Sequence, residues 1–82
     1  MYYLYVLKSK KTDKFYIGYA KDLQQRILQH NNGESLATKS AIPWELVYYE
    51  AYASQGLARK REAKLKHHGK GFAELKKRIL ED

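Results

Sequence analysis

The sequence predicts a small α+β domain, with a three-stranded antiparallel sheet flanked by helices in the order β-β-α-β-α-α. Three apolar or alternating runs, at residues 2–7, 15–19 and 45–52, have the composition and length of strands. Helical hydrophobic spacing recurs between and after these runs. The chain has 82 residues, which is the size of one domain, so we expect a single domain over 1–82.

The first two strands should form an antiparallel hairpin, because only a short polar link containing Thr12 and Asp13 separates them. Residues 2–7 are apolar on both faces, which predicts a strand that is covered on both sides. The run at 45–52 has no tight turn to either neighbour. Its place in the sheet therefore stays open at this point.

The first helix should begin after Asp22, a residue type that caps helices, with Gln25 in the capping-box position three residues later. Leu23 and Ile27 give this helix its core stripe, and residues 31–33 carry its stop signal. A loop follows as far as the third strand.

The second helix should occupy residues 55–67, with Ser54 as its cap, and the glycines of 69–71 should end it. A last helix follows, with a core face at i, i+3 and i+7 formed by Phe72, Leu75 and Ile79.

Charge narrows the functional classes. Sixteen Lys and Arg against nine Asp and Glu give a net charge of +7, and residues 54–82 are the more basic part. This balance favours a polyanionic partner, most often nucleic acid, although a merely solvated basic surface is the simpler alternative. The chain has no cysteine, which excludes disulfides and thiolate chemistry. Its longest opening apolar run, 2–7, is far below the roughly 20 residues of a membrane span, so we expect a cytoplasmic protein.

Glu62 is the first candidate for chemistry. It is the only acid in an otherwise basic helix, and its spacing from Ala58 and Leu65 places it on the apolar face. A carboxylate directed toward a core is costly unless it is paired or holds a metal. An ion pair with Lys66 would satisfy it, and its hard oxygens would also suit Mg²⁺.

Arg26 and His30 are the second candidates. They are four residues apart, so they project from the same side of the first helix at the edge of its core stripe. Such a pair can equally be two solvated polar residues.

Tyrosines are the third candidates, and the chain has eight of them. Those on the first two strands can be core residues, stacking platforms for unpaired bases, or proton-transfer groups. Proton transfer at neutral pH requires a phenol pKa about 3 below its usual value near 10, which needs a metal or several cations close by. The tyrosines on these two strands include Tyr3, Tyr5, Tyr16 and Tyr19.

The candidate residues, in the order in which they occur along the chain, resemble the sequence pattern of the GIY-YIG endonucleases. Tyr3-Leu4-Tyr5, ten residues and then Tyr16-Ile17-Gly18 look like the paired signature of that family. The run from Gly18 to Arg26, the following His30, and Glu62 in its basic helix are similar to later parts of the family pattern. The chain departs from the pattern in two ways: Tyr3 stands where glycine is usual, and no asparagine follows Asn32.

The resemblance implies a set of catalytic roles. Glu62 would bind one divalent metal, Mg²⁺ or Mn²⁺, and Arg26 would neutralise the scissile phosphate. Tyr5 is the first choice to activate the attacking water, and Tyr16 would support it or share the role. His30 would orient a tyrosine hydroxyl or relay a proton. These residues alone do not decide which tyrosine is the base.

The resemblance therefore predicts a metal-dependent DNA endonuclease, of the kind used in DNA repair, that holds phosphates through basic residues around Glu62. The substrate can be single-stranded, branched or duplex DNA, and RNA is not excluded. Two alternatives are a non-catalytic nucleic-acid-binding module of the same fold and a basic partner-binding domain. An exposed Trp44 would favour the latter. The predicted DNA-binding residues are Lys21, Arg59, Lys60, Arg61, Lys64 and Lys66.

Overall fold

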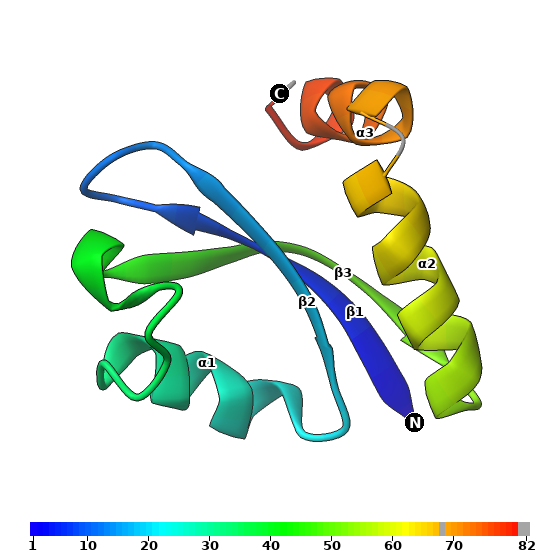
Figure 1. Ribbon diagram of the computed structural model, residues 1–82, viewed down its shortest axis with the longest axis horizontal. Coiled ribbons are helices and arrows are strands. Elements are labelled where there is room, and N and C mark those ends of the chain that lie inside the picture. Colours follow the sequence, from blue (N-terminus) through cyan, green and yellow to red (C-terminus); the bar gives the residue numbers. More distant parts are fainter. Residues whose placement is uncertain (68, 81–82) are drawn as a thin grey trace.

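The computed structural model describes residues 1–67 and 69–80 (Figure 1). The elements follow in the order β1 (Tyr2–Ser9), β2 (Phe15–Ala20), α1 (Leu23–Asn31), a short 3₁₀ helix (Lys39–Ala41), β3 (Trp44–Tyr52), α2 (Gln55–His67) and α3 (Gly69–Leu80). This order confirms the predicted α+β fold. One boundary differs: α3 begins at Gly69, so the glycines of 69–71 lie in its first turn rather than before it.

The sheet has the strand order β2-β1-β3, and both pairings are antiparallel. β1 is therefore the central strand, which explains why its residues are apolar on both faces. Tyr5 of β1 lies opposite Gly18 of β2 and opposite Tyr49 of β3. This register brings the two halves of the sequence signature side by side.

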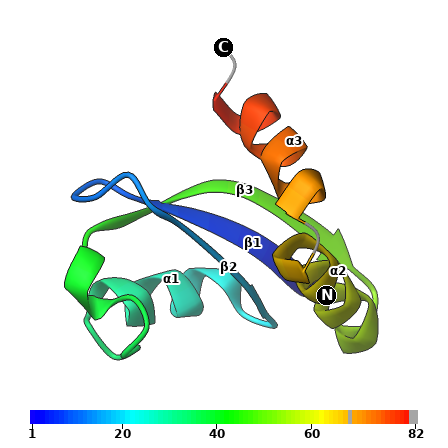
Figure 2. The same ribbon diagram turned by 45° about the horizontal axis from the view of Figure 1, so that its top comes forward.

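The helices cover the two faces of the sheet. Figures 1 and 2 show α1 on one face and α2 with α3 on the other. Alternate residues of β1 serve the two cores, because successive side chains of a strand point to opposite faces. The core under α1 contains Tyr5, Leu7, Ala20, Ala41 and Trp44. The core under α2 and α3 contains Leu4, Val6, Ile17, Leu65 and Leu75.

Local hydrogen bonds fix α1 at both ends. The Asp22 side chain accepts a hydrogen bond from the backbone N–H of Gln25 at 3.0 Å, as the capping pattern predicted. At the other end, the Asn31 amide binds the backbone of Trp44 twice, donating to its carbonyl at 3.0 Å and accepting from its N–H at 2.6 Å. The end of α1 is thereby tied to the first residue of β3, which also fixes the neighbouring His30.

A carboxylate anchors α2 to the sheet. Glu50 of β3 accepts two hydrogen bonds from Arg61, at 3.0 and 3.1 Å, and one from each of the hydroxyls of Tyr48 and Tyr52. Burial alone would raise the pKa of Glu50, but the hydrogen bonds from Arg61 and the two tyrosines outweigh it and lower that pKa. The ion pair sets the rotation of α2, and so the direction in which Glu62 points.

Trp44 is not an exposed docking residue. It is buried at the start of β3, and its indole N–H donates to the carbonyl of Thr38 at 2.8 Å. The expectation that an exposed Trp44 marks a partner surface is therefore wrong. Within the described parts of the chain, no helix is both long enough and apolar enough to cross a membrane.

Candidate active site

Four of the five predicted catalytic residues meet at the β2 edge of the sheet, and the fifth, His30, lies buried behind Tyr5. Tyr5 and Tyr16 come from the two paired strands, Arg26 from α1 on one face, and Glu62 from α2 on the other. All four line one hollow of about 520 Å³. Residues that are up to 57 positions apart in the sequence (Tyr5 and Glu62) are therefore neighbours in space.

Gly18 makes room for the Tyr5 ring. A Cβ atom at Gly18 would lie 2.5 Å from the Tyr5 hydroxyl oxygen and 2.6 Å from the ring carbon that carries it. Side-chain carbons do not approach that closely, so any larger residue would push the ring away. The glycine of the second signature tripeptide is thus required by the position of the tyrosine in the first.

Tyr5 begins a buried hydrogen-bonded chain. Its hydroxyl lies 2.9 Å from Nε2 of His30, and Nδ1 of His30 lies 2.8 Å from the hydroxyl oxygen of Thr38. All three residues are at most 2% exposed. His30 is therefore not the solvated polar residue that its helical position also allowed.

The His30 ring in this chain carries no charge at neutral pH. Burial, with the nearby Arg26 charge, lowers the pKa of His30 from its usual 6.5, so the imidazole is neutral at pH 7. A neutral imidazole has one donor and one acceptor nitrogen. In the tautomer whose Nδ1–H donates to the Thr38 hydroxyl, Nε2 accepts the proton of Tyr5.

Burial raises the pKa of Tyr5 to about 12; the neighbouring Tyr16 adds to this rise and the Arg26 guanidinium opposes it. This is the reverse of the fall that a free phenolate base at neutral pH requires. Tyr5 therefore rests as a phenol, with a neutral acceptor already in place for its proton.

Tyr16 lies beside the same histidine. Its ring centroid is 5.0 Å from the His30 ring and 6.4 Å from the Tyr5 ring. The ammonium of Lys66, from α2, lies 5.7 Å from the centroid of Tyr16. Tyr16 is less buried than Tyr5, and it faces a cation that Tyr5 lacks.

Glu62 is partly buried, with 19% of its side chain exposed, and its Oε2 lies 3.4 Å from Nζ of Lys66. The structure is thus compatible with both roles that the sequence suggested for Glu62, an ion pair with Lys66 and a ligand for a metal ion. The carboxylate points into the hollow, and its intrahelical ion pair is of the weak, exposed kind, worth about 0.3–0.5 kcal/mol. A cation or substrate group can therefore compete for it at little cost.

Thr38 is the residue that sequence reasoning missed. It lies in the long loop before β3, eight positions after His30, and no periodicity marks it. Its side chain holds His30, while its carbonyl accepts from Trp44. The only signal in the sequence was that a residue with a hydroxyl group occurs in the loop after His30. The path of that loop in the structure is what shows that Thr38 and His30 are in contact.

Comparison with known proteins identifies relatives of this chain. Residues 1–76 match the model of the GIY-YIG catalytic domain. The chain is 42% identical over 66 residues to a UPF0213 protein of Staphylococcus saprophyticus, and 41% identical to one of Staphylococcus epidermidis, each match covering 79% of both chains. The chain belongs to the GIY-YIG family. A solution NMR structure of a UPF0213 protein from Bacillus halodurans is similar in fold, with a TM-score of 0.56 and 30% identity over 93% of this chain and 84% of that one.

The GIY-YIG catalytic domain is typically a nuclease domain and binds nucleic acid, so family membership supports the coarse class of function. The two signature tripeptides are the facing segments of β1 and β2. Tyr3, which replaces the first glycine of the signature, packs edge-to-face against Tyr49 of β3, with ring centroids 5.9 Å apart.

The residues of this GIY-YIG site fit a hydrated divalent ion. Among residues 1–67 and 69–80, no three His, Cys, Asp or Glu side chains come together, which excludes a closed site built from protein ligands alone. Mg²⁺ commonly binds through one or two carboxylates, several waters and the substrate phosphate. Glu62 in its open hollow fits that mode of binding, in which water and a substrate phosphate would supply the other ligands.

The predicted DNA-binding residues divide into three groups. Lys21 lines the hollow and Lys66 pairs with Glu62, whereas Arg59 lines another hollow together with Lys60. Lys60 and Lys64 line a separate hollow with His67 on the far side of the helix. Arg61 is engaged by Glu50. Of the five cations of α2 that were expected around Glu62, Lys66 contacts it, Arg61 pairs with Glu50, and the other three line hollows to which Glu62 does not contribute.

Proposed function

We propose that this protein is a metal-dependent endonuclease that hydrolyses phosphodiester bonds in DNA. The observation that carries the proposal is the convergence of two tyrosines, a cation and a carboxylate on one hollow at the β2 edge, with a buried neutral histidine hydrogen-bonded to Tyr5 behind it. Packing alone does not explain why these polar and charged groups lie together, because a protein core gains nothing from groups that each need a hydrogen-bond partner or solvent. Family membership supports the same class of reaction.

Proton transfer would begin at Tyr5. As the attacking water approaches phosphorus, its proton passes to the Tyr5 oxygen while the Tyr5 hydroxyl proton passes to Nε2 of His30. The water becomes the nucleophilic hydroxide that attacks phosphorus, Tyr5 stays a phenol, and His30 becomes an imidazolium. This relay needs no resting phenolate, so it suits a Tyr5 pKa of about 12. Thr38 keeps the acceptor nitrogen of His30 directed at Tyr5.

Charge would be neutralised from two sides. Arg26, on the α1 side of the hollow, would contact the nonbridging oxygens of the scissile phosphate as negative charge grows there. Glu62, on the α2 side, would hold Mg²⁺ or Mn²⁺, which lowers the pKa of a bound water and stabilises the leaving oxygen. Lys66 would then be released from Glu62 and remain beside Tyr16.

Cleavage of end-labelled single-stranded, duplex and branched DNA, and of RNA, with Mg²⁺, Mn²⁺ or chelator, tests the proposal. We expect metal-dependent cutting that falls by at least about 100-fold in Glu62→Gln, the scale of a lost catalytic charge. Glu74→Gln, which changes an exposed acid on α3, is the matched control and should cut normally. Binding without cutting by a folded wild-type protein would instead establish the non-catalytic module.

A further inference from the structure

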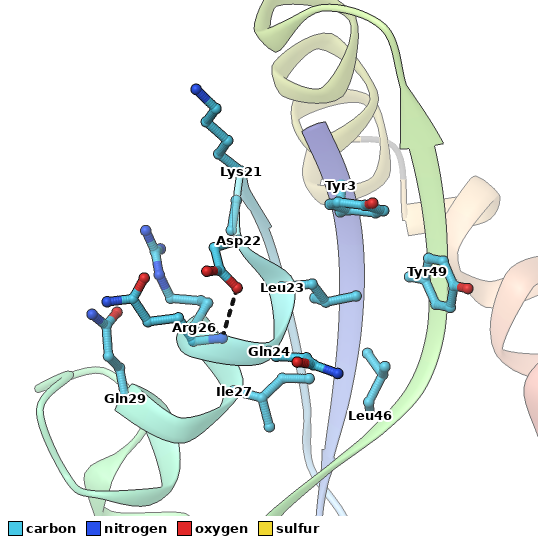
Figure 3. A pocket seen from close by; sticks show the side chains of 12 residues that line it. Tyr3, Lys21, Asp22, Leu23, Gln24, Arg26, Ile27, Gln29, Leu46 and Tyr49 are labelled. Atoms are coloured by element: carbon cyan, nitrogen blue, oxygen red, sulfur yellow. Dashed lines mark hydrogen bonds between the residues drawn. The ribbon is translucent and has the colours of Figure 1, made fainter. Parts of the chain in front are cut away.

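A second hollow adjoins the site. It has a volume of about 920 Å³ and follows the N-terminal half of α1. Lys21 and Arg26 line both this hollow and the candidate active site. Figure 3 shows Tyr3, Tyr49 and Leu46 facing α1 across the hollow, with Lys21 and Arg26 around the other side of the helix. We call this hollow the tyrosine groove.

The tyrosine groove exposes aromatic surface that the fold does not need. Tyr49 is 54% exposed, although it lies in the middle of β3. Its ring and that of Tyr3 meet at 65°, and in an edge-to-face pair one ring keeps both of its faces free of the other. Flat aromatic faces of this kind are the platforms on which unpaired bases stack.

Polar groups line the rest of this hollow. Figure 3 shows the Gln24 side chain extending toward Leu46, between α1 and the sheet, where its amide can donate to and accept from a base edge. Lys21 and Arg26 supply positive charge, while the carboxylate of Asp22 is occupied as the cap of α1. An apolar peptide or a second copy of this basic chain would leave the two cations unpaired. A nucleotide matches both parts, with a base for the tyrosines and a phosphate for the cations.

We propose that the tyrosine groove binds an unpaired base of the DNA strand whose phosphate lies at Arg26, and so selects single-stranded DNA. The inference rests on the proposed function, because the strand must run from the groove into the catalytic hollow. A duplex hides its base faces in its own stack and offers nothing for Tyr49. Selection therefore comes from the opened base, while the phosphates are held in the same way in every substrate.

Binding measured in chelator, where cutting is blocked, tests the groove separately from catalysis. The probe is a fluorescent 12-nucleotide strand, alone or as a duplex. We expect Tyr49→Ala to weaken single-strand binding by about 5- to 150-fold, the range for one lost stacking contact, and to leave duplex binding unchanged. Tyr49→Phe keeps the ring and should bind within about twofold of wild type. Leu36→Ala, at an exposed leucine outside the groove, controls for surface apolar loss.

An abasic scan along the single strand sharpens the test. Wild type should lose affinity when the base at one particular position is removed, and Tyr49→Ala should be insensitive at that position. Equal losses on single strands and duplexes, or no loss at all, would overturn the proposal. So would a homodimer in sedimentation that Tyr49→Ala dissociates. Tyrosine-dependent binding without any cleavage in Mg²⁺ would leave the groove standing and refute the nuclease; cleavage without tyrosine dependence would do the reverse.

Discussion

Replacing Thr38 by valine isolates the outer end of the proton relay. Valine has nearly the shape of threonine, so the fully buried position stays filled. The backbone bonds of residue 38 survive, including the acceptance of the Trp44 indole N–H by its carbonyl. What disappears is the hydroxyl oxygen 2.8 Å from Nδ1 of His30. The substitution therefore tests one hydrogen bond in a retained core.

The expected cost follows from the burial of His30. Its Nδ1–H would lose its partner in a place that is only 2% exposed, and an unsatisfied buried donor costs about 1–3 kcal/mol. For a domain of this size, each kcal/mol lowers Tm by about 4–8 °C. Thr38→Val should thus melt roughly 4–24 °C below wild type and remain folded at 25 °C, because domains of this kind have about 5–15 kcal/mol of stability.

The effect on catalysis has a separate cause. Without Thr38 to accept from Nδ1, His30 is free to carry its proton on Nε2, where it can no longer accept from Tyr5. Loss of a positioned base costs about 10²- to 10⁴-fold in rate. Thr38→Ser keeps the hydroxyl and should retain most of the activity, although it loses one methyl group, worth about 0.8 kcal/mol of burial.

Thermal melting, cleavage kinetics and the ¹⁵N chemical shifts of the His30 ring nitrogens measure these effects independently. We expect wild type and Thr38→Ser to show a neutral ring protonated at Nδ1, and Thr38→Val to show a shifted tautomer. If Thr38→Val has the same Tm and the same tautomer as wild type, the hydrogen-bonded chain from Tyr5 to Thr38 is wrong. This conclusion would not depend on whether the protein cuts DNA.

Three further predictions address the supports of the site. Gly18→Ala should displace the Tyr5 ring, lowering stability by about 1–3 kcal/mol in denaturant melts and abolishing cleavage; a variant with wild-type activity would contradict the close contact. Glu50→Ala should leave Arg61 without its carboxylate and cost about 1–3 kcal/mol, discounted for partial exposure, whereas an unchanged urea midpoint would show that the anchor is unimportant. Because the pKa of His30 is lowered in the fold, the unfolded chain binds more protons than the folded one as pH falls below 6.5. The free energy of unfolding should therefore decrease from pH 6.5 down to the folded pKa of His30. A flat profile over this range in urea titrations would count against a neutral buried imidazole.

Local patterns in the sequence were sufficient for the elements and for several site residues. The cap at Asp22 depends only on residues within one turn, and the structure shows its bond to Gln25. The continuous burial of β1 from Leu4 to Leu7 follows from its unbroken apolar run, since only a central strand covered on both sides needs two apolar faces. Glu62 was identifiable because a single acid on the apolar face of a helix is costly to bury unless it is paired or binds a metal.

Contacts between distant segments were beyond such patterns. The order β2-β1-β3 depends on how a loop of more than ten residues returns to the sheet, and no turn residue records that path. The pairing of Tyr3 with Tyr49 exists only because β3 lies beside β1. From the sequence, Arg61 was predicted to bind DNA, but the packing of α2 on β3 places it in an ion pair with Glu50.

The candidate site depends on three separate anchors, and each holds one of its groups in place. Gly18 seats the Tyr5 ring, the Asn31 amide holds the end of α1 beside His30, and the Glu50–Arg61 pair sets the rotation of α2 beneath Glu62. A phosphate in the hollow would therefore meet groups already in position, which is the condition under which electrostatic stabilisation is most effective. Because β2 is an edge strand, this arrangement leaves the catalytic groups open to a substrate strand while both faces of the thin sheet stay covered. An 82-residue chain can thus combine a stable core with an accessible site.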